Sequence, residues 1–113
     1  MPFYGTPPAQ LADASECRVP VQGHFGLKDA LAGFSDPAAA AALEAALAEA
    51  CVAHEVHRYT GVGHAFMNAS PQSVALKTKL GQIGPKPDDA KHDPAAINLA
   101  WGRTIAFLRK HGI

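Results

Sequence analysis

The sequence predicts a small α/β domain with about three mainly parallel strands flanked by helices, in the order strand, strand, helix, strand, helix. Two short apolar runs end in glycines, and a titratable residue follows each of them, as expected for strands that run into loops. Two longer segments begin with Asp-Pro, which is a common start of a helix. With 113 residues, the chain is expected to form a single domain over residues 1–113.

Three segments have the composition of strands. Residues 1–5 are short and apolar and run into a proline-rich turn, and residues 19–25 are apolar and partly β-branched. Residues 54–60 alternate weakly and carry charges on both faces, which favours an edge strand. A sheet this thin leaves open edges, so the chain is expected to meet a partner.

The remaining segments predict two helices and a long connection. Residues 37–53 follow Asp36 and are dominated by alanine and leucine, which favours a helix. Prolines and glycines near the centre of residues 69–93 predict a loop, with room for a short helix at 71–79. Residues 94–110 carry an apolar stripe at helical spacing. The residues expected in the core from this last helix are Ile97, Ala100, Trp101, Thr104, Ile105, Phe107 and Leu108.

Composition excludes several classes of partner. Ten basic and ten acidic residues give a formal net charge of zero, so the long-range field that attracts nucleic acid or an anionic membrane is missing. No apolar run reaches the ~20 residues of a membrane helix, and the first residues lack the regions of a signal peptide. Cys17 and Cys51 lack CxxC spacing, which fits a reducing compartment. We expect a cytoplasmic protein with no nucleic-acid or membrane partner, no cofactor and, because its histidines are scattered, no metal site.

Asp29 and His64 are the candidate site residues. Each follows the glycine-containing end of a predicted strand, and the carboxyl ends of parallel strands meet at one edge of a sheet. Imidazole titrates near neutrality, and a carboxylate on one ring nitrogen fixes the tautomer and stabilises the imidazolium. The pattern therefore predicts an acid and base pair at this edge.

Three motifs together carry a family resemblance. They are His24-Phe25-Gly26-Leu27-Lys28-Asp29, Gly63-His64-Ala65-Phe66 and the stretch from Ala100 to Leu108, Ala-Trp-Gly-Arg-Thr-Ile-Ala-Phe-Leu. The chain resembles, over nearly its whole length, the carboxyl-terminal half of a dienelactone hydrolase, a branch of the α/β-hydrolase fold. The resemblance implies a truncated α/β-hydrolase-type fold with Asp29 as the triad acid and His64 as the triad base. It also implies hydrolysis of an ester or lactone through an acyl-enzyme formed on a Cys or Ser nucleophile.

The sequence departs from that family in its nucleophile. A motif of the form G-x-C-x-G or G-x-S-x-G belongs upstream of the acid, and none occurs in this chain, which has about half the length of a full family member. Cys17 and Cys51 precede their strands and are expected about 20 Å from the acid and base. The serines on the correct edge, Ser35, Ser70 and Ser73, lack the strained elbow context. Asn68 stands where the family has an arginine that helps to hold a substrate carboxylate, so dienelactone itself is not implied as the substrate.

Three hypotheses follow from this pattern. The chain is half of an ester or lactone hydrolase, inactive alone and completed by a missing amino-terminal half or by another copy. Alternatively, it is a non-catalytic remnant that persists as a homo-oligomer, such as a homodimer. As a third reading, it is a small-molecule binding module that keeps the floor of the family's pocket around Asp29, His64 and Phe66.

Overall fold

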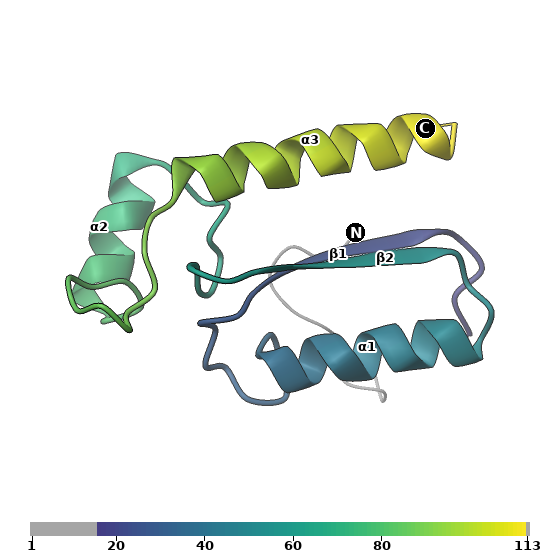
Figure 1. Cartoon of the computed structure of the whole chain (residues 1–113), viewed down its shortest axis with the longest axis horizontal. Helices are drawn as coiled ribbons and strands as arrows, with labels where there is room; N and C mark the ends of the chain where they lie inside the picture. The colour runs from purple at the N-terminus through teal and green to yellow at the C-terminus, as the bar shows by residue number, and fades with distance from the viewer. Residues whose placement is uncertain (1–15, 113) are drawn as a thin grey trace.

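The computed structural model describes residues 16–112 of the chain. Its elements are β1 (Val21–Gly26), α1 (Pro37–Glu49), β2 (His54–Tyr59), α2 (Pro71–Lys79) and α3 (Pro94–Lys110). The two strands pair in parallel, with Val21 opposite His54 and Gly26 opposite Tyr59. α1 lies on one side of the strands, α3 lies on the other, and α2 lies beyond the carboxyl ends of the strands (Figure 1). The predicted α/β class is therefore confirmed.

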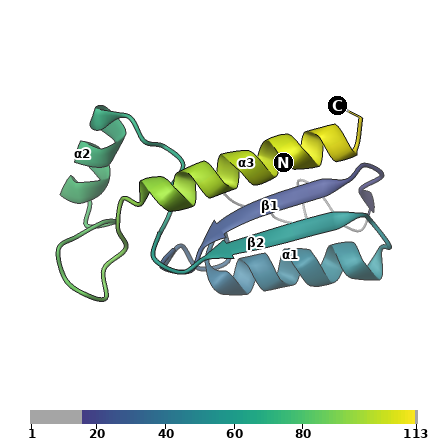
Figure 2. The same cartoon turned by 45° about the horizontal axis from the view of Figure 1, so that its top comes forward.

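Two strands are found in residues 16–112, where about three were predicted for the whole chain. The expected strand at residues 1–5 lies outside the described residues. Among the described residues β1 is the one strand that pairs with β2, as expected for an edge strand (Figure 2). The short helix that the sequence allowed within the long connection is present as α2, with the expected bounds.

The helices begin where the sequence predicts because the caps are local. Asp36, Ser70 and Asp93 each precede a proline, and their side chains accept hydrogen bonds from backbone N–H groups of the first turn. α1 ends at Glu49, four residues before the predicted end at 53. Cys51 takes a left-handed conformation with φ of 58°, and the Val52 N–H donates to the Leu47 carbonyl at 3.0 Å. This turn stops the helix early because the chain must reverse before β2.

The buried face of α3 contains fewer apolar residues than the sequence predicts. Its buried residues are Ile97, Ala100, Thr104 and Phe107. Trp101 and Ile105 are 48% and 47% exposed, so their expected place in the core is wrong. Arg103 lies over the Tyr59 ring of β2, and Trp101 lies on the opposite flank of the helix at 3.6 residues per turn. Neither α3 nor any other helix within residues 16–112 is long and apolar enough to cross a membrane.

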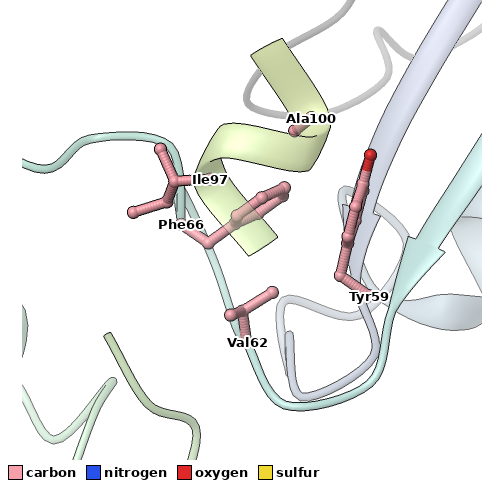
Figure 3. Close-up of a cluster of buried hydrophobic side chains, with 5 residues drawn as sticks. All are labelled: Tyr59, Val62, Phe66, Ile97 and Ala100. Atoms are coloured by element: carbon pink, nitrogen blue, oxygen red, sulfur yellow. The ribbon is translucent and has the colours of Figure 1, made fainter. Parts of the chain in front are cut away.

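Apolar side chains anchor both helices to the strands. Leu47 of α1 is 1% exposed, and Phe25 of β1 is also buried. On the α3 side, a cluster gathers at the carboxyl end of β2 and in the loop behind it (Figure 3). Its members are Tyr59, Val62, Phe66, Ile97 and Ala100. Because Val62 and Phe66 lie on either side of His64 in the chain, this cluster fixes the loop that carries the histidine.

Candidate active site

The loops that follow β1 and β2 are bound to each other. The Leu27 N–H donates to the Tyr59 carbonyl at 2.9 Å, and the Lys28 N–H donates to the Val62 carbonyl at 2.9 Å. Gly26 lies against this crossing, since a Cβ atom on it would stand 2.5 Å from the Val62 carbonyl oxygen. The contact admits no side chain at Gly26. Both loops are therefore held in one arrangement at the carboxyl edge of the sheet.

The structure brings the two predicted site residues together. Asp29 Oδ2 lies 3.1 Å from His64 Nδ1, and Asp29 Oδ1 accepts a hydrogen bond from the Leu31 N–H at 3.0 Å. The side chain of Asp29 is 4% exposed, whereas that of His64 is 19% exposed. A carboxylate at Nδ1 favours the tautomer with the proton on that nitrogen. Nε2 is then the basic nitrogen, and no described residue is a hydrogen-bond partner of it.

Ser35 joins the pair at the same ring nitrogen. Its Oγ lies 3.1 Å from His64 Nδ1, and the residue is 3% exposed. The sequence placed Ser35 just before α1 and gave no sign of this contact, which depends on how the chain turns between β1 and α1. A triad nucleophile faces Nε2, so Ser35 is on the wrong side of the ring for that role. Ser70 and Ser73 instead bond to each other at the start of α2.

α2 supports the histidine loop through Lys77, a residue that the sequence did not single out. The Lys77 ammonium donates to the carbonyls of Ala65 at 3.2 Å and Asn68 at 2.9 Å. Burial lowers the pKa of this ammonium. Ala65, the residue after His64, has φ of 54°, a left-handed conformation that is costly for a residue with a Cβ atom. The bonds to Lys77 hold the loop in this conformation.

A hollow of about 250 Å³ opens beside the imidazole. Its lining residues are Lys28, Ala30, Leu31, His64, Gly81, Gln82, Asp88, Asp89 and Ala90. Lys28 donates through Nζ to the Asp88 carbonyl at 2.9 Å, and the Lys91 N–H donates to the Gly61 carbonyl at 2.9 Å. These bonds hold the connection between α2 and α3 against the site. The hollow is small for an organic ligand site, which suits a compact molecule.

The described residues contain no group of three or more His, Cys, Asp or Glu side chains that could hold a metal ion. His54 and His57 lie on opposite faces of β2, as their spacing predicted, since His57 stacks on His24 of β1 and His54 bonds the Val52 carbonyl. Cys17 and Cys51 line a separate hollow before the strands begin. A six-residue strand lies between that end and the site, so the thiols are about 20 Å from His64.

Comparison with known protein families gives one finding. The model of the dienelactone hydrolase family matches residues 1–112, which is essentially the whole chain. A search of curated proteins finds no match to this chain.

Proposed function

This chain belongs to the dienelactone hydrolase family, and from that premise we propose that it supplies the acid and the base of an ester or lactone hydrolase. The nucleophile in this proposal comes from outside residues 1–113. The observation that carries the proposal is the contact of Asp29 Oδ2 with His64 Nδ1 at 3.1 Å, with no described residue bonded to Nε2. A hydroxyl or thiol nucleophile needs a basic nitrogen of this kind, with no hydrogen-bond partner already in place, to accept its proton.

The proposed mechanism divides the work between the two residues. Asp29 holds the Nδ1 proton and offsets the charge of the imidazolium. His64 Nε2 accepts the proton of the nucleophile as that group attacks the carbonyl carbon of the ester or lactone. The protonated Nε2 then donates to the leaving alcohol oxygen, and the same cycle with water releases the acid. Ser35 and Lys77 position the ring and its loop and touch no reacting atom.

The proposed source of the nucleophile is an amino-terminal half that lies on another chain. Exposed apolar side chains support a protein partner, and on α3 they include Leu99, Trp101 and Ile105. The proposal also places the protein in the cytoplasm, which the two free cysteines fit. A catalytically silent homo-oligomer uses the same surfaces and differs in having no substrate.

A second candidate function is small-molecule binding without chemistry. The hollow beside His64, at about 250 Å³, supports it, since it brings polar side chains around one partly exposed imidazole. Titration with short-chain lactones, followed by NMR, separates the two functions. Binding without turnover, even when a nucleophile is supplied, favours this second function.

The deciding experiment adds the missing group. The chain is mixed with the separately produced amino-terminal half of a complete dienelactone hydrolase, which carries the elbow, and hydrolysis of an aryl lactone is measured. We expect no turnover by the chain alone and turnover by the mixture. That turnover disappears with His64→Ala and survives in His92→Ala, a matched change at an exposed histidine. Turnover by the chain alone that His64→Ala abolishes would place the nucleophile inside residues 1–113 and contradict the proposal.

A further inference from the structure

The amino-terminal end of the sheet carries a second hollow, of about 460 Å³. Its lining residues are Cys17, Arg18, Val19, Pro20, Ala50, Cys51, Val52 and Ala53. Both cysteines of the chain are therefore brought to one place by two segments that are far apart in the sequence. The proposed hydrolase chemistry uses neither of them.

The strand register explains why both cysteines line one hollow. Val21 lies opposite His54 in the parallel pair, and the Val21 N–H donates to the Ala53 carbonyl at 3.0 Å. The segments that lead into β1 and β2 are thus already aligned before the strands begin. Cys17 stands four residues before Val21 and Cys51 stands three residues before His54, and both line the hollow at this end of the sheet. The early end of α1 at Glu49 contributes, because the turn at Cys51 leaves that residue at this end of the sheet.

Both thiols are available for chemistry. Cys51 is exposed and Cys17 is half-buried, and neither is in a disulfide. The Cys17 thiol donates a weak hydrogen bond to the Val19 carbonyl at 3.3 Å, which a ligand bound to sulfur replaces. Apart from Arg18 and the two cysteines, the side chains that line the hollow are apolar. They offer no carboxylate or side-chain amide oxygen of the kind that Mg²⁺ and Ca²⁺ prefer.

The ligand set selects the class of ion. Thiolate sulfur prefers soft cations. A structural zinc site needs four ligands, and the part of the chain that the structure describes has no third His, Cys, Asp or Glu here. We propose that Cys17 and Cys51 together bind one soft d¹⁰ cation, with Cu(I) as the physiological type, through two thiolates. Binding releases the two thiol protons and involves no change of oxidation state.

The bound ion links the two segments that feed the sheet. A ligand that binds only the folded chain raises its free energy of unfolding. The ion therefore stabilises the amino-terminal end of the strands, and it does so independently of Asp29 and His64 at the other end.

The test is anaerobic competition of the full chain with a coloured Cu(I) chelator. We expect the wild type to remove one Cu(I) per chain, with no change in its mass in solution and with a higher melting temperature. Cys17→Ser and Cys51→Ser should each lose the ability to compete, while both keep the metal-free far-ultraviolet circular dichroism of the wild type. His92→Ala is the matched control and should bind as the wild type does.

Three outcomes would overturn the proposal. One Cu(I) per two chains with a doubled mass would mean that the thiols bridge copies. Two Cu(I) per chain would mean that each thiol binds alone. A single cysteine variant that competes as well as the wild type would show that one thiol suffices.

Discussion

Two histidines, His24 in β1 and His64 in the loop after β2, show how differently a fold can place one kind of side chain. His24 lies beneath α3 and is 4% exposed. Its Nδ1 accepts from the Tyr59 hydroxyl at 2.8 Å, and its Nε2 donates to Gln22 Oε1 at 2.9 Å. Thr104 Oγ1 stands 3.2 Å from the same Nε2. Both ring nitrogens are hydrogen-bonded to neutral groups, so the neutral ring keeps its proton on Nε2 and has no nitrogen available for proton transfer.

The charge state of His24 follows from this setting. Burial lowers the pKa of His24 from 6.5 to about 4, and the positive charges of His57 and Arg103 act in the same direction. A proton on Nδ1 would face the Tyr59 hydroxyl, which already directs its own hydrogen there. His24 is therefore a neutral structural group at physiological pH.

His64 has the opposite arrangement. A buried carboxylate lies at one ring nitrogen, the other nitrogen has no hydrogen-bond partner among the described residues, and His64 lines a hollow. The comparison teaches that burial and neutral partners make a histidine part of the core. A carboxylate at one nitrogen, with no partner from the described residues at the other, is the arrangement that a general base uses, which is the role proposed for His64.

The largest expected effect is the loss of His24. His24→Ala leaves a cavity and strands the buried Tyr59 hydroxyl and Gln22 amide oxygen, so we expect a loss of about 3 kcal/mol in the free energy of unfolding. Urea denaturation followed by circular dichroism measures it. A loss below about 1 kcal/mol would mean that the His24 network contributes little to stability.

A comparable loss in the free energy of unfolding should occur when the pH is lowered. The unfolded chain binds a proton at His24 near pH 6.5, while the folded chain resists it down to about pH 4. The His24 contribution is fully present above pH 6.5 and is lost as the pH falls to 4, at about 1.4 kcal/mol per pH unit and about 3 kcal/mol in total. Urea denaturation at several pH values gives the slope. His24→Gln should flatten it between these limits, and an unchanged slope would assign it to other groups.

A smaller effect is expected at the edge of the site. Ser35→Ala removes one neutral hydrogen bond to His64 Nδ1 and should cost about 1 kcal/mol of stability. Ser35→Thr keeps the hydroxyl and should recover part of the loss. If both variants lose the same amount, the packing of Ser35 matters and its bond to the imidazole does not.

A loss of similar size is expected for His64→Ala. This change takes one partner from Ser35 and one from Asp29, but Asp29 keeps the Leu31 N–H, and water can replace a side chain that is 19% exposed. His64→Ala should therefore lower the free energy of unfolding by about 1 kcal/mol. A loss as large as that of His24→Ala, measured under the same conditions, would remove the contrast between the two histidines.

Features with local causes could be predicted from the sequence. The bounds of α3 follow from the Asp93-Pro94 start and from the helical spacing of its apolar residues. These features all lie within the segment itself. The meeting of Asp29 and His64 follows from parallel strands that end at one edge. The sequence predicts that α1 ends at residue 53, but it ends at Glu49, because the turn at Cys51 is set by the reversal into β2 and not by residues of helical preference.

Features that depend on packing could not be predicted. Ser35 reaches His64 only because the loop after β1 folds back, and Lys77 reaches the Ala65 carbonyl only because α2 packs beyond the strand ends. The exposure of Trp101 depends on how much of the sheet lies under α3. The spacing of apolar residues along the helix carries no information about the extent of the sheet.

The central claim, that Asp29 orients His64 with Nε2 open, is tested most directly by ¹⁵N NMR of the His64 ring at a pH where the imidazole is neutral. We predict the tautomer with the proton on Nδ1 in the wild type. In Asp29→Asn an amide donor can face Nδ1, so the proton should move to Nε2, a change that costs about 10⁴-fold in kcat in a serine protease triad. The Asp93→Asn variant, at the start of α3, is the control and should keep the wild-type tautomer. A proton on Nε2 in the wild type, or a tautomer that ignores Asp29→Asn, would contradict the account.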